Sequence, residues 1–188
     1  MAPSISGKKV AFIATNGVEQ SELAEPWAAI EKAGGEPTLI SLESGTITAL
    51  RHDWDRGDDF TVDLEILAAN PDDFQALVLP GGTLNADALR GNSDVRTFVR
   101  AFFDQHKPVS AICHAPWILI DAGVVEGRRL TSVPTVSTDL KNAGAQWVDE
   151  EVVVDAGLMT SRTPADLAAF CAKTVEEIAE GKHSDQTA

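Results

Sequence analysis

The chain has few cysteines, few basic residues and no long apolar run. Its two cysteines, Cys113 and Cys171, are too few for a disulfide framework, and reduced thiols predict a cytoplasmic location. Fifteen basic residues against 29 acidic ones give a net charge of −14, which argues against nucleic acid or an anionic membrane as a partner. No segment approaches the length of a membrane span, and no basic-plus-apolar signal sequence opens the chain.

The residues that are present predict a globular protein. Hydrophobic residues make up 44% of the 188 residues, which is enough to build one domain over residues 1–188 with a full hydrophobic core. Residues 1–7 are predicted to form a loose leader. Residues 181–188 are polar and are predicted to form a frayed tail.

Short apolar runs alternate with amphipathic segments along the chain. The unalternating apolar run at 8–14 is typical of a parallel strand buried on both faces, and further strands are predicted at 36–42, 76–79, 109–112 and 129–132. The amphipathic segments predict helices at 22–33, 87–90, 94–106, 117–122, 138–142 and 163–179. We also expect a small hairpin within 43–62, a helical turn at 63–69 and a hairpin at 151–161. This order predicts a doubly wound α/β sheet with helices on both faces and ligands beyond the carboxyl ends of the strands.

Cys113 stands between a predicted strand and a predicted helix. Strand, sharp turn and helix are the layout of a nucleophile elbow, which holds its reactive side chain at the tip of the turn. The turn brings the flanking backbone together, so the positions two before and two after the tip must be small. Both are alanines, Ala111 and Ala115. The N–H groups at the start of the helix favour a thiolate, the nucleophilic form of cysteine.

A purely structural role for Cys113 is the alternative. Cysteine is among the most buried residue types, and most free cysteines are small core residues. The neighbouring His114 and the paired alanines favour a reactive cysteine, and the local pattern alone leaves the two interpretations even.

An acid from the first loop, 15–20, or from the helix after it is expected at the same sheet edge. A carboxyl of Glu19 or Glu22 near Cys113 would donate a hydrogen bond to a thiolate or pass a proton to a substrate. The alternative for Glu19 is an ordinary acid in the first turn of a helix, where the helix dipole favours it.

A glycine pair ends the predicted strand 76–79. The N–H groups of Gly81 and Gly82, together with that of His114, are candidates for an oxyanion hole. An ordinary turn is the alternative, because a Gly-Gly pair alone is a weak signal.

A Cys–His–acid mechanism needs a base, and His114 is the local candidate among four histidines. A glutaminase-type triad needs a His-x-Glu pair well after the nucleophile, but the one later histidine, His183, lies in the tail. This argues against glutamine hydrolysis. Neighbouring side chains usually diverge, yet a strained elbow lets both face one pocket. Neither a metal nor a cofactor is predicted, since a lone Cys-His pair has too few ligands for a zinc site.

Seven segments carry a family resemblance: ATNGVE at 14–19 leading to Glu22, VLPGG at 78–82, AICHAPW at 111–117, LTS at 130–132, NAGAQWVD at 142–149, EVVVD at 151–155 and TSRTPADL at 160–167. Together they resemble the PfpI (ThiJ/PfpI) family of the class I glutamine-amidotransferase-like superfamily, over nearly all of residues 8–177. The resemblance implies a flavodoxin-like sandwich with Cys113 at the elbow.

The resemblance also implies roles for three further residues. Glu19 matches the family's acid that contacts the cysteine. His114 matches the family's histidine, which pairs with an acid from a neighbouring subunit, and Asp87 would be that acid. The site would then be complete only in a homo-oligomer, a dimer at least.

Members of the family are described as intracellular peptidases, cofactor-free glyoxalases, deglycases and general stress proteins. The resemblance therefore implies a cysteine-dependent enzyme in which Cys113 attacks a peptide carbonyl or the aldehyde of a dicarbonyl such as methylglyoxal. Carbonyl compounds and glycated adducts are favoured over peptides, because a peptidase must protonate an amine leaving group. One alternative is a redox-responsive stress protein whose Cys113 is oxidised with little turnover. A vestigial family member that only binds is another.

Overall fold

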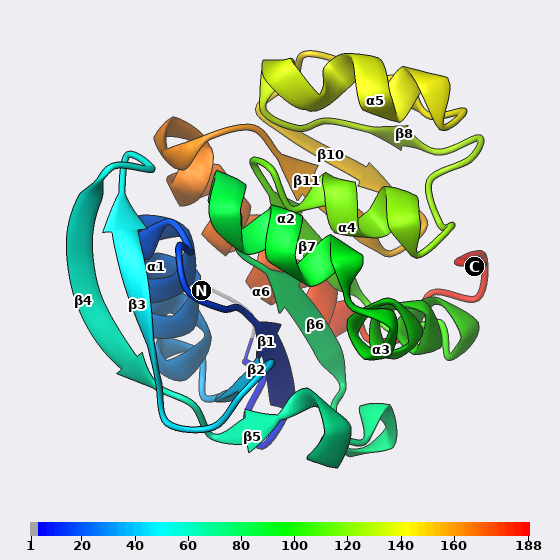
Figure 1. Cartoon of the computed structure of the whole chain (residues 1–188). Helices are drawn as coiled ribbons and strands as arrows, with labels where there is room; N and C mark the ends of the chain where they lie inside the picture. Colours follow the sequence, from blue (N-terminus) through cyan, green and yellow to red (C-terminus); the bar gives the residue numbers. More distant parts are fainter. Residues whose placement is uncertain (1–3) are drawn as a thin grey trace.

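A seven-stranded sheet forms the centre of the computed structural model, which describes residues 4–188 (Figure 1). The strands run in the order β10-β11-β7-β6-β1-β2-β5, and every neighbouring pair is parallel except the β10–β11 hairpin. Their bounds are β1 Lys9–Ile13, β2 Glu36–Ser41, β5 Leu64–Glu65, β6 Ala76–Leu79, β7 Val109–Ile112, β10 Val152–Asp155 and β11 Leu158–Ser161.

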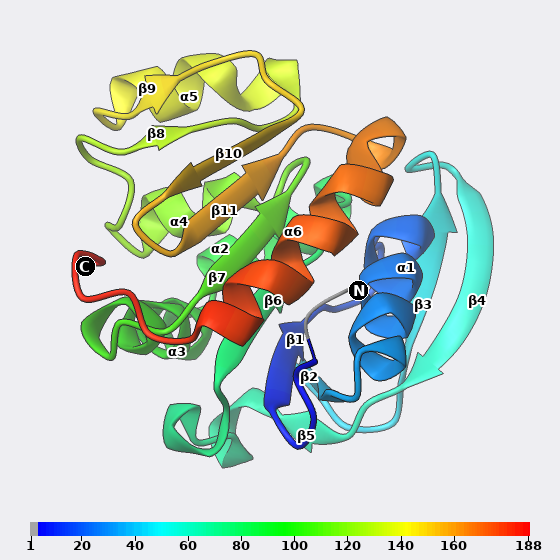
Figure 2. The same ribbon diagram turned by 180° about the vertical axis from the view of Figure 1, so that it is seen from behind.

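Helices cover both faces of this sheet, which confirms the predicted flavodoxin-like doubly wound fold. On one face lie α1 (Gln20–Lys32) and α6 (Leu167–Glu180), which stand in front in Figure 2. On the other lie α2 (Thr83–Gly91), α3 (Ser93–Asp104) and α4 (Pro116–Asp121), in front in Figure 1. A short helix, α5 (Ser137–Asn142), packs against a small parallel pair, β8 (Arg129–Leu130) and β9 (Gln146–Trp147).

The central strands are buried because each face has its own hydrophobic core. All residues of β6 and β7 are buried, as expected for central parallel strands, and the one polar residue among them is Ser110. One core lies under α3 and α4 and contains Phe98 and Phe102, and the other lies under α1 and α6 and contains Phe12 and Phe170. Because β7, β6 and β1 are adjacent and parallel, the three loops that follow them begin at the same edge of the sheet.

The hairpin predicted within 43–62 is formed by β3 (Thr46–Arg51) and β4 (Asp55–Thr61), which stand outside the sheet beside α1 (Figure 1). It is fastened to the loop before α1 and to the start of that helix. Leu50 donates its N–H to the carbonyl of Val18 at 2.8 Å, and the side chain of Gln20 both donates to and accepts from Asp58. This fastening fixes the position of the hairpin tip.

Some predicted boundaries are wrong. The helix predicted at 87–90 begins earlier, at Thr83, because the buried Asn85 side chain bonds the backbone of Thr15, Pro80 and Gly81 and so holds that segment against the loops. The segment predicted as a helical turn, 63–69, contains the short strand β5 before a single 3-10 turn at Ile66–Ala68.

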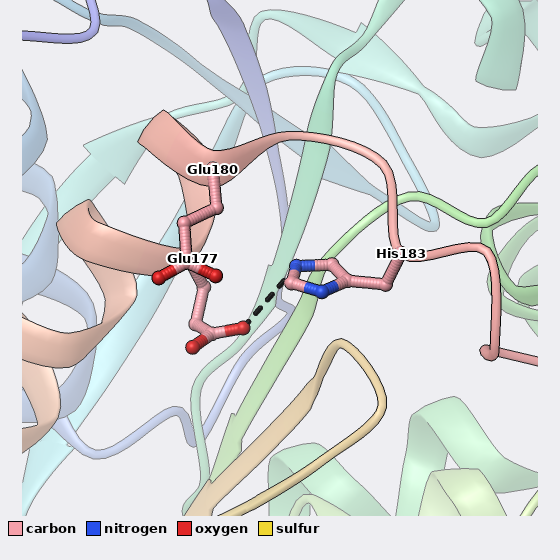
Figure 3. A group of neighbouring side chains, drawn as sticks. All are labelled: Glu177, Glu180 and His183. Carbon is pink, nitrogen blue, oxygen red and sulfur yellow. Dashed lines mark ion pairs between the residues drawn. The ribbon is translucent and has the colours of Figure 1, made fainter.

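The predictions for the two ends also need correction. Residues 1–3 of the predicted leader lie outside the described residues, but Ile5 is buried and its N–H bonds the carbonyl of Ala33. The tail, predicted to be frayed, folds back along the molecule. His183 donates its backbone N–H to His106 and pairs with the buried carboxylate of Glu177 (Figure 3). Burying a carboxylate without partners costs free energy, so the contact with Glu177 favours the position of the polar tail against α6. No helix within residues 4–188 has the length and apolarity that a membrane crossing requires.

Candidate active site

Cys113 occupies a strained turn between β7 and α4. Its φ of 64° lies in the left-handed region, which costs a non-glycine residue about 1–3 kcal/mol. The surrounding chain holds it there, because its N–H donates to Ser161 at 3.1 Å and its carbonyl accepts from Val133 at 3.0 Å. Ala111 and Ala115 are fully buried where the backbone closes. The structure thus forms the elbow that the sequence predicts.

Glu22, and not Glu19, is the carboxyl that meets the sulfur of Cys113. Glu22 is fully buried, its Oε2 accepts from the N–H of Gly81 at 2.9 Å, and its carboxyl lies within hydrogen-bonding reach of the Cys113 thiol. The other oxygen, Oε1, has no nitrogen or oxygen partner among the described residues. Burial raises the pKa of Glu22 to about 8, so the acid is mainly protonated at neutral pH and has a proton to donate.

The assignment of Glu19 to the cysteine is therefore a correction. Glu19 lies just before α1, with an extended backbone, and its carboxylate turns towards the β3–β4 hairpin. Oε2 accepts from the N–H of His52 at 2.8 Å and Oε1 accepts from the hydroxyl of Ser21 at 3.3 Å. Glu22 lies three residues further along, where the first helical turn points it inwards to Cys113.

The Cys113 thiol is neutral at rest. Burial raises its pKa well above the usual range and the nearby Glu22 adds to this, while the N–H groups of Gly82 and His114 work in the opposite direction. Burial therefore outweighs the thiolate-favouring effect expected from the start of the helix, where the first residue of α4, Pro116, has no N–H to offer. Deprotonation of Cys113 therefore depends on a neighbouring base.

The two glycines after β6 direct their N–H groups to different partners. The N–H of Gly81 is engaged by Glu22, so Gly81 does not join the candidate oxyanion hole. The N–H groups of Gly82 and His114 lie beside the Cys113 sulfur. Gly81 must be glycine for steric reasons, since an added Cβ would lie 2.4 Å from Oε2 of Glu22 and 2.7 Å from Cβ of Cys113.

His114 lies with its Nδ1 3.3 Å from the sulfur of Cys113. The strained elbow thus brings two neighbouring side chains together. The opposite nitrogen, Nε2, is 3.3 Å from the hydroxyl of Thr83, and the ring packs against Trp117. Burial lowers the pKa of His114 and Asp53 raises it, with burial the larger effect. A neutral ring with a free Nδ1 is a base for the cysteine proton.

Thr83 and Asp53 are site residues that sequence reasoning missed. Thr83 carried a signal, because it follows the glycine pair, whereas Asp53 lies in a hairpin whose docking no local pattern records. Asp87 lies on α2 with an exposed side chain. The acid that bears on His114 within this chain is Asp53, and the role of Asp87 towards a neighbouring subunit stays a prediction.

Among the described residues, one group of three side chains has the spacing of metal ligands: Glu177, Glu180 and His183, at the end of α6 and in the tail (Figure 3). The Glu177 carboxylate already has a cation, since its Oε1 lies 2.9 Å from the ammonium of Lys173. His183 pairs with its other oxygen at 3.2 Å. The ion pair with Lys173 and the contact with His183 explain this group as one that fastens the tail to α6.

Comparison with known proteins gives consistent matches. The model of the DJ-1/PfpI family matches residues 8–177. A deglycase of Pyrococcus horikoshii is 44% identical over 168 residues, which are 89% of this chain and 98% of that protein. The protein/nucleic acid deglycase 2 of Escherichia coli K12 is 44% identical over 165 residues, 87% and 93% of the two chains. The crystal structure of Drosophila melanogaster DJ-1beta matches with a TM-score of 0.84 and 30% identity, over 92% of this chain and 91% of the other.

Proposed function

The chain belongs to the DJ-1/PfpI family, and from that premise we propose that it is a cysteine-dependent deglycase that acts on adducts of small dicarbonyls such as methylglyoxal. The proposal is supported by relatives that are named deglycases and are 44% identical to this chain over the aligned residues. We also propose that this deglycase is a stress protein of the cytoplasm, since its two free cysteines suit a reducing compartment.

The observation that carries the proposal is the placement of Cys113 beside both a proton donor and a proton acceptor. Glu22 holds a proton near neutral pH within hydrogen-bonding reach of the sulfur, and Nδ1 of His114 lies 3.3 Å from it. A carbonyl adduct needs both functions, because its reaction moves several protons and requires no outside oxidant.

The chemistry balances with water as the other reactant. His114 takes the thiol proton, and the sulfur of Cys113 forms a bond to the aldehyde-level carbon of the adduct while the amine or thiol of the modified residue leaves with a proton. The resulting hemithioacetal loses a proton from this carbon and gains one at the adjacent ketone carbon. One carbon is oxidised by two electrons and the other is reduced by two, which yields a lactoyl thioester. Water then releases lactate and restores the thiol.

The burial of the sulfur favours small substrates. Cys113 is only 8% exposed, so a short adduct on a flexible side chain or a free amino acid suits the site better than a folded polypeptide. Peptide hydrolysis would also need an acid placed at the amine leaving group. In this proposal that acid depends on a second subunit of a homo-oligomer, whose Asp87 pairs with His114.

The test uses the hemithioacetal of N-acetylcysteine and the aminocarbinol of N-acetyl-lysine, each made with methylglyoxal and purified from free dicarbonyl. We measure adduct loss and lactate for the parent protein, Cys113→Ser and, as matched control, Cys171→Ser on α6. The rate of adduct loss must exceed the rate of spontaneous dissociation of the adduct. An enzyme that consumes only free methylglyoxal removes adducts no faster than they dissociate, so this criterion separates it from a deglycase. We expect that activity is lost in Cys113→Ser and retained in Cys171→Ser.

Three results would overturn the proposal. Lactate formation that is equal in the parent and Cys113→Ser would remove the cysteine chemistry. An inactive parent whose Cys113 gains oxygen atoms in intact-mass analysis after mild peroxide would replace the deglycase with the redox-responsive stress protein. Cleavage of labelled casein without adduct turnover would replace it with the peptidase.

A further inference from the structure

The tip of the β3–β4 hairpin lies against the start of α2, and Asp53 joins the two elements. Oδ1 of Asp53 accepts from the backbone N–H of Thr83 at 2.9 Å, and Oδ2 accepts from the Thr83 hydroxyl at 3.1 Å. Both oxygens of one carboxylate are thus committed to one residue. Such a pair of contacts fixes the direction of the hydroxyl as well as the position of the helix start.

The direction of the Thr83 hydroxyl decides which nitrogen of His114 carries the proton. The hydroxyl has a single proton and gives it to Asp53, which as a carboxylate only accepts. Its lone pairs then face Nε2 of His114, 3.3 Å away, so this nitrogen must be the N–H donor. A neutral imidazole has one N–H, and the other nitrogen, Nδ1, is left as a lone pair 3.3 Å from the sulfur of Cys113.

The hairpin tip that supplies Asp53 is held in a costly conformation. His52 and Asp53 both adopt left-handed backbone angles, with φ of 57° and 61°, each worth about 1–3 kcal/mol of strain for such residues. The Glu19 carboxylate bonds the N–H of His52 at 2.8 Å and helps to hold the tip there. Such strain persists only where contacts with the surrounding structure hold the backbone in place. Here the strained tip places Asp53 against Thr83, which faces the His114 ring.

We propose that Asp53 is a positioning residue which, through the Thr83 hydroxyl, holds His114 in the Nε2–H tautomer and so leaves Nδ1 to take the proton of Cys113. The acid comes from the same chain as the cysteine. The proposal rests on the proposed function in making Cys113 the nucleophile, but the measurements below need no carbonyl substrate.

The first measurement reads the tautomer in the parent protein. Long-range ¹H–¹⁵N spectra of protein labelled in histidine distinguish an Nε2–H ring from an Nδ1–H ring, with His114→Gln used to assign the signal. We expect Nε2–H in the parent. Asp53→Asn presents an amide N–H to the Thr83 hydroxyl, which turns the hydroxyl proton towards the ring, so we expect Nδ1–H in that variant. An Nδ1–H ring in the parent would overturn the proposal.

The second measurement is the rate of Cys113 alkylation by iodoacetamide across pH, followed by intact mass in a Cys171→Ser background. The thiolate displaces iodide, so the rate reports proton transfer to His114. We expect Asp53→Asn and Thr83→Val to slow alkylation at pH 7 by at least about 10²-fold, the low end of what a lost general base costs. Thr83→Ser keeps the hydroxyl, so its alkylation rate should lie within about twofold of the parental rate and its pH profile should match that of the parent.

Asp55→Asn is the matched control, because it removes the same charge from the same hairpin at an exposed position. It should alkylate like the parent. Parental rates and pH profiles in both Asp53→Asn and Thr83→Val would overturn the proposal. So would equal slowing in Thr83→Ser, which would assign the effect to packing. A failed deglycase assay combined with the expected tautomer and rates would refute the proposed function alone.

Discussion

The backbone N–H of Gly81 donates a 2.9 Å hydrogen bond to Oε2 of Glu22, beside the Cys113 thiol. Because Oε2 is held as an acceptor, the proton of the neutral acid belongs on Oε1, the oxygen without another nitrogen or oxygen partner among the described residues. The Gly81 contact thus holds one oxygen of the acid as an acceptor and leaves the other to carry the proton.

The raised pKa of Glu22 predicts a stability that falls with rising pH. The pKa is about 8 in the folded protein and 4.5 without the fold, so between these values the folded state binds more protons than the unfolded state. Stability therefore declines from about pH 4.5 to pH 8, by an amount on the order of 4 kcal/mol for a shift of this size. Urea denaturation at pH 5 and pH 8.5 should show this decline reduced in Glu22→Gln.

Glu25→Gln is the control for this measurement. Glu25 lies on the same helix but is exposed, so its substitution should leave the pH dependence of the parent unchanged. Parallel stability curves for the parent and Glu22→Gln would show that Glu22 is ionised in the folded protein.

The same acid predicts a separation of turnover from cysteine reactivity. Glutamine at position 22 keeps an acceptor for Gly81 and an N–H for the sulfur, but it has no proton to transfer. We expect Glu22→Gln to lose about 10²–10⁴-fold in kcat for the carbonyl adduct while Cys113 alkylation stays within about threefold of the parent. Glu19→Gln retains its contacts to the hairpin and should keep kcat within about threefold. The reverse order of the two variants would restore Glu19 as the proton donor.

Gly81 predicts a steric test of the site. An alanine Cβ there would lie 2.4 Å from Glu22, 2.7 Å from Cys113 and 2.8 Å from the carbonyl of Ile112, and backbone cannot move aside cheaply. We expect Gly81→Ala to lower the free energy of unfolding by about 3 kcal/mol, the upper range for overpacking, and to abolish turnover. Gly91→Ala meets no atom within 4 Å and should be as stable as the parent or more so. Equal thermal melting of the two variants would contradict this.

The parts of the site that depend on local sequence pattern could be predicted from the sequence. Short, mostly apolar strands and the small residues around Cys113 predicted the sheet and the elbow, because burial on two faces and a tight turn restrict the types of neighbouring residues. The parallel order of β7, β6 and β1 then brought the three predicted loops to one edge.

The sequence did not carry the parts that depend on docking between distant elements. Glu19 and Glu22 are both acids near the start of α1, and only the packing of Gly81 against that helix selects Glu22. Asp53 reaches the site because the hairpin is fastened to the loop before α1 and to the start of that helix, through Leu50 and Gln20. Such contacts join residues that are tens of positions apart and leave no periodicity to recognise.

Asp87 and Asp53 make opposite predictions in mixed oligomers. If Asp87 completes the site of a neighbouring subunit, a dimer of one Cys113→Ser chain and one Asp87→Asn chain has one complete site, with its cysteine from the second chain and its acid from the first. Such heterodimers, purified through two different tags, should recover about half of the parental kcat for a two-fold dimer. Asp53 acts within its own chain, so a Cys113→Ser and Asp53→Asn heterodimer should stay at half the residual rate of Asp53→Asn. Recovery in the Asp53 pair would place that acid across an interface, and a monomer in light scattering would remove the role of Asp87 in a neighbouring subunit.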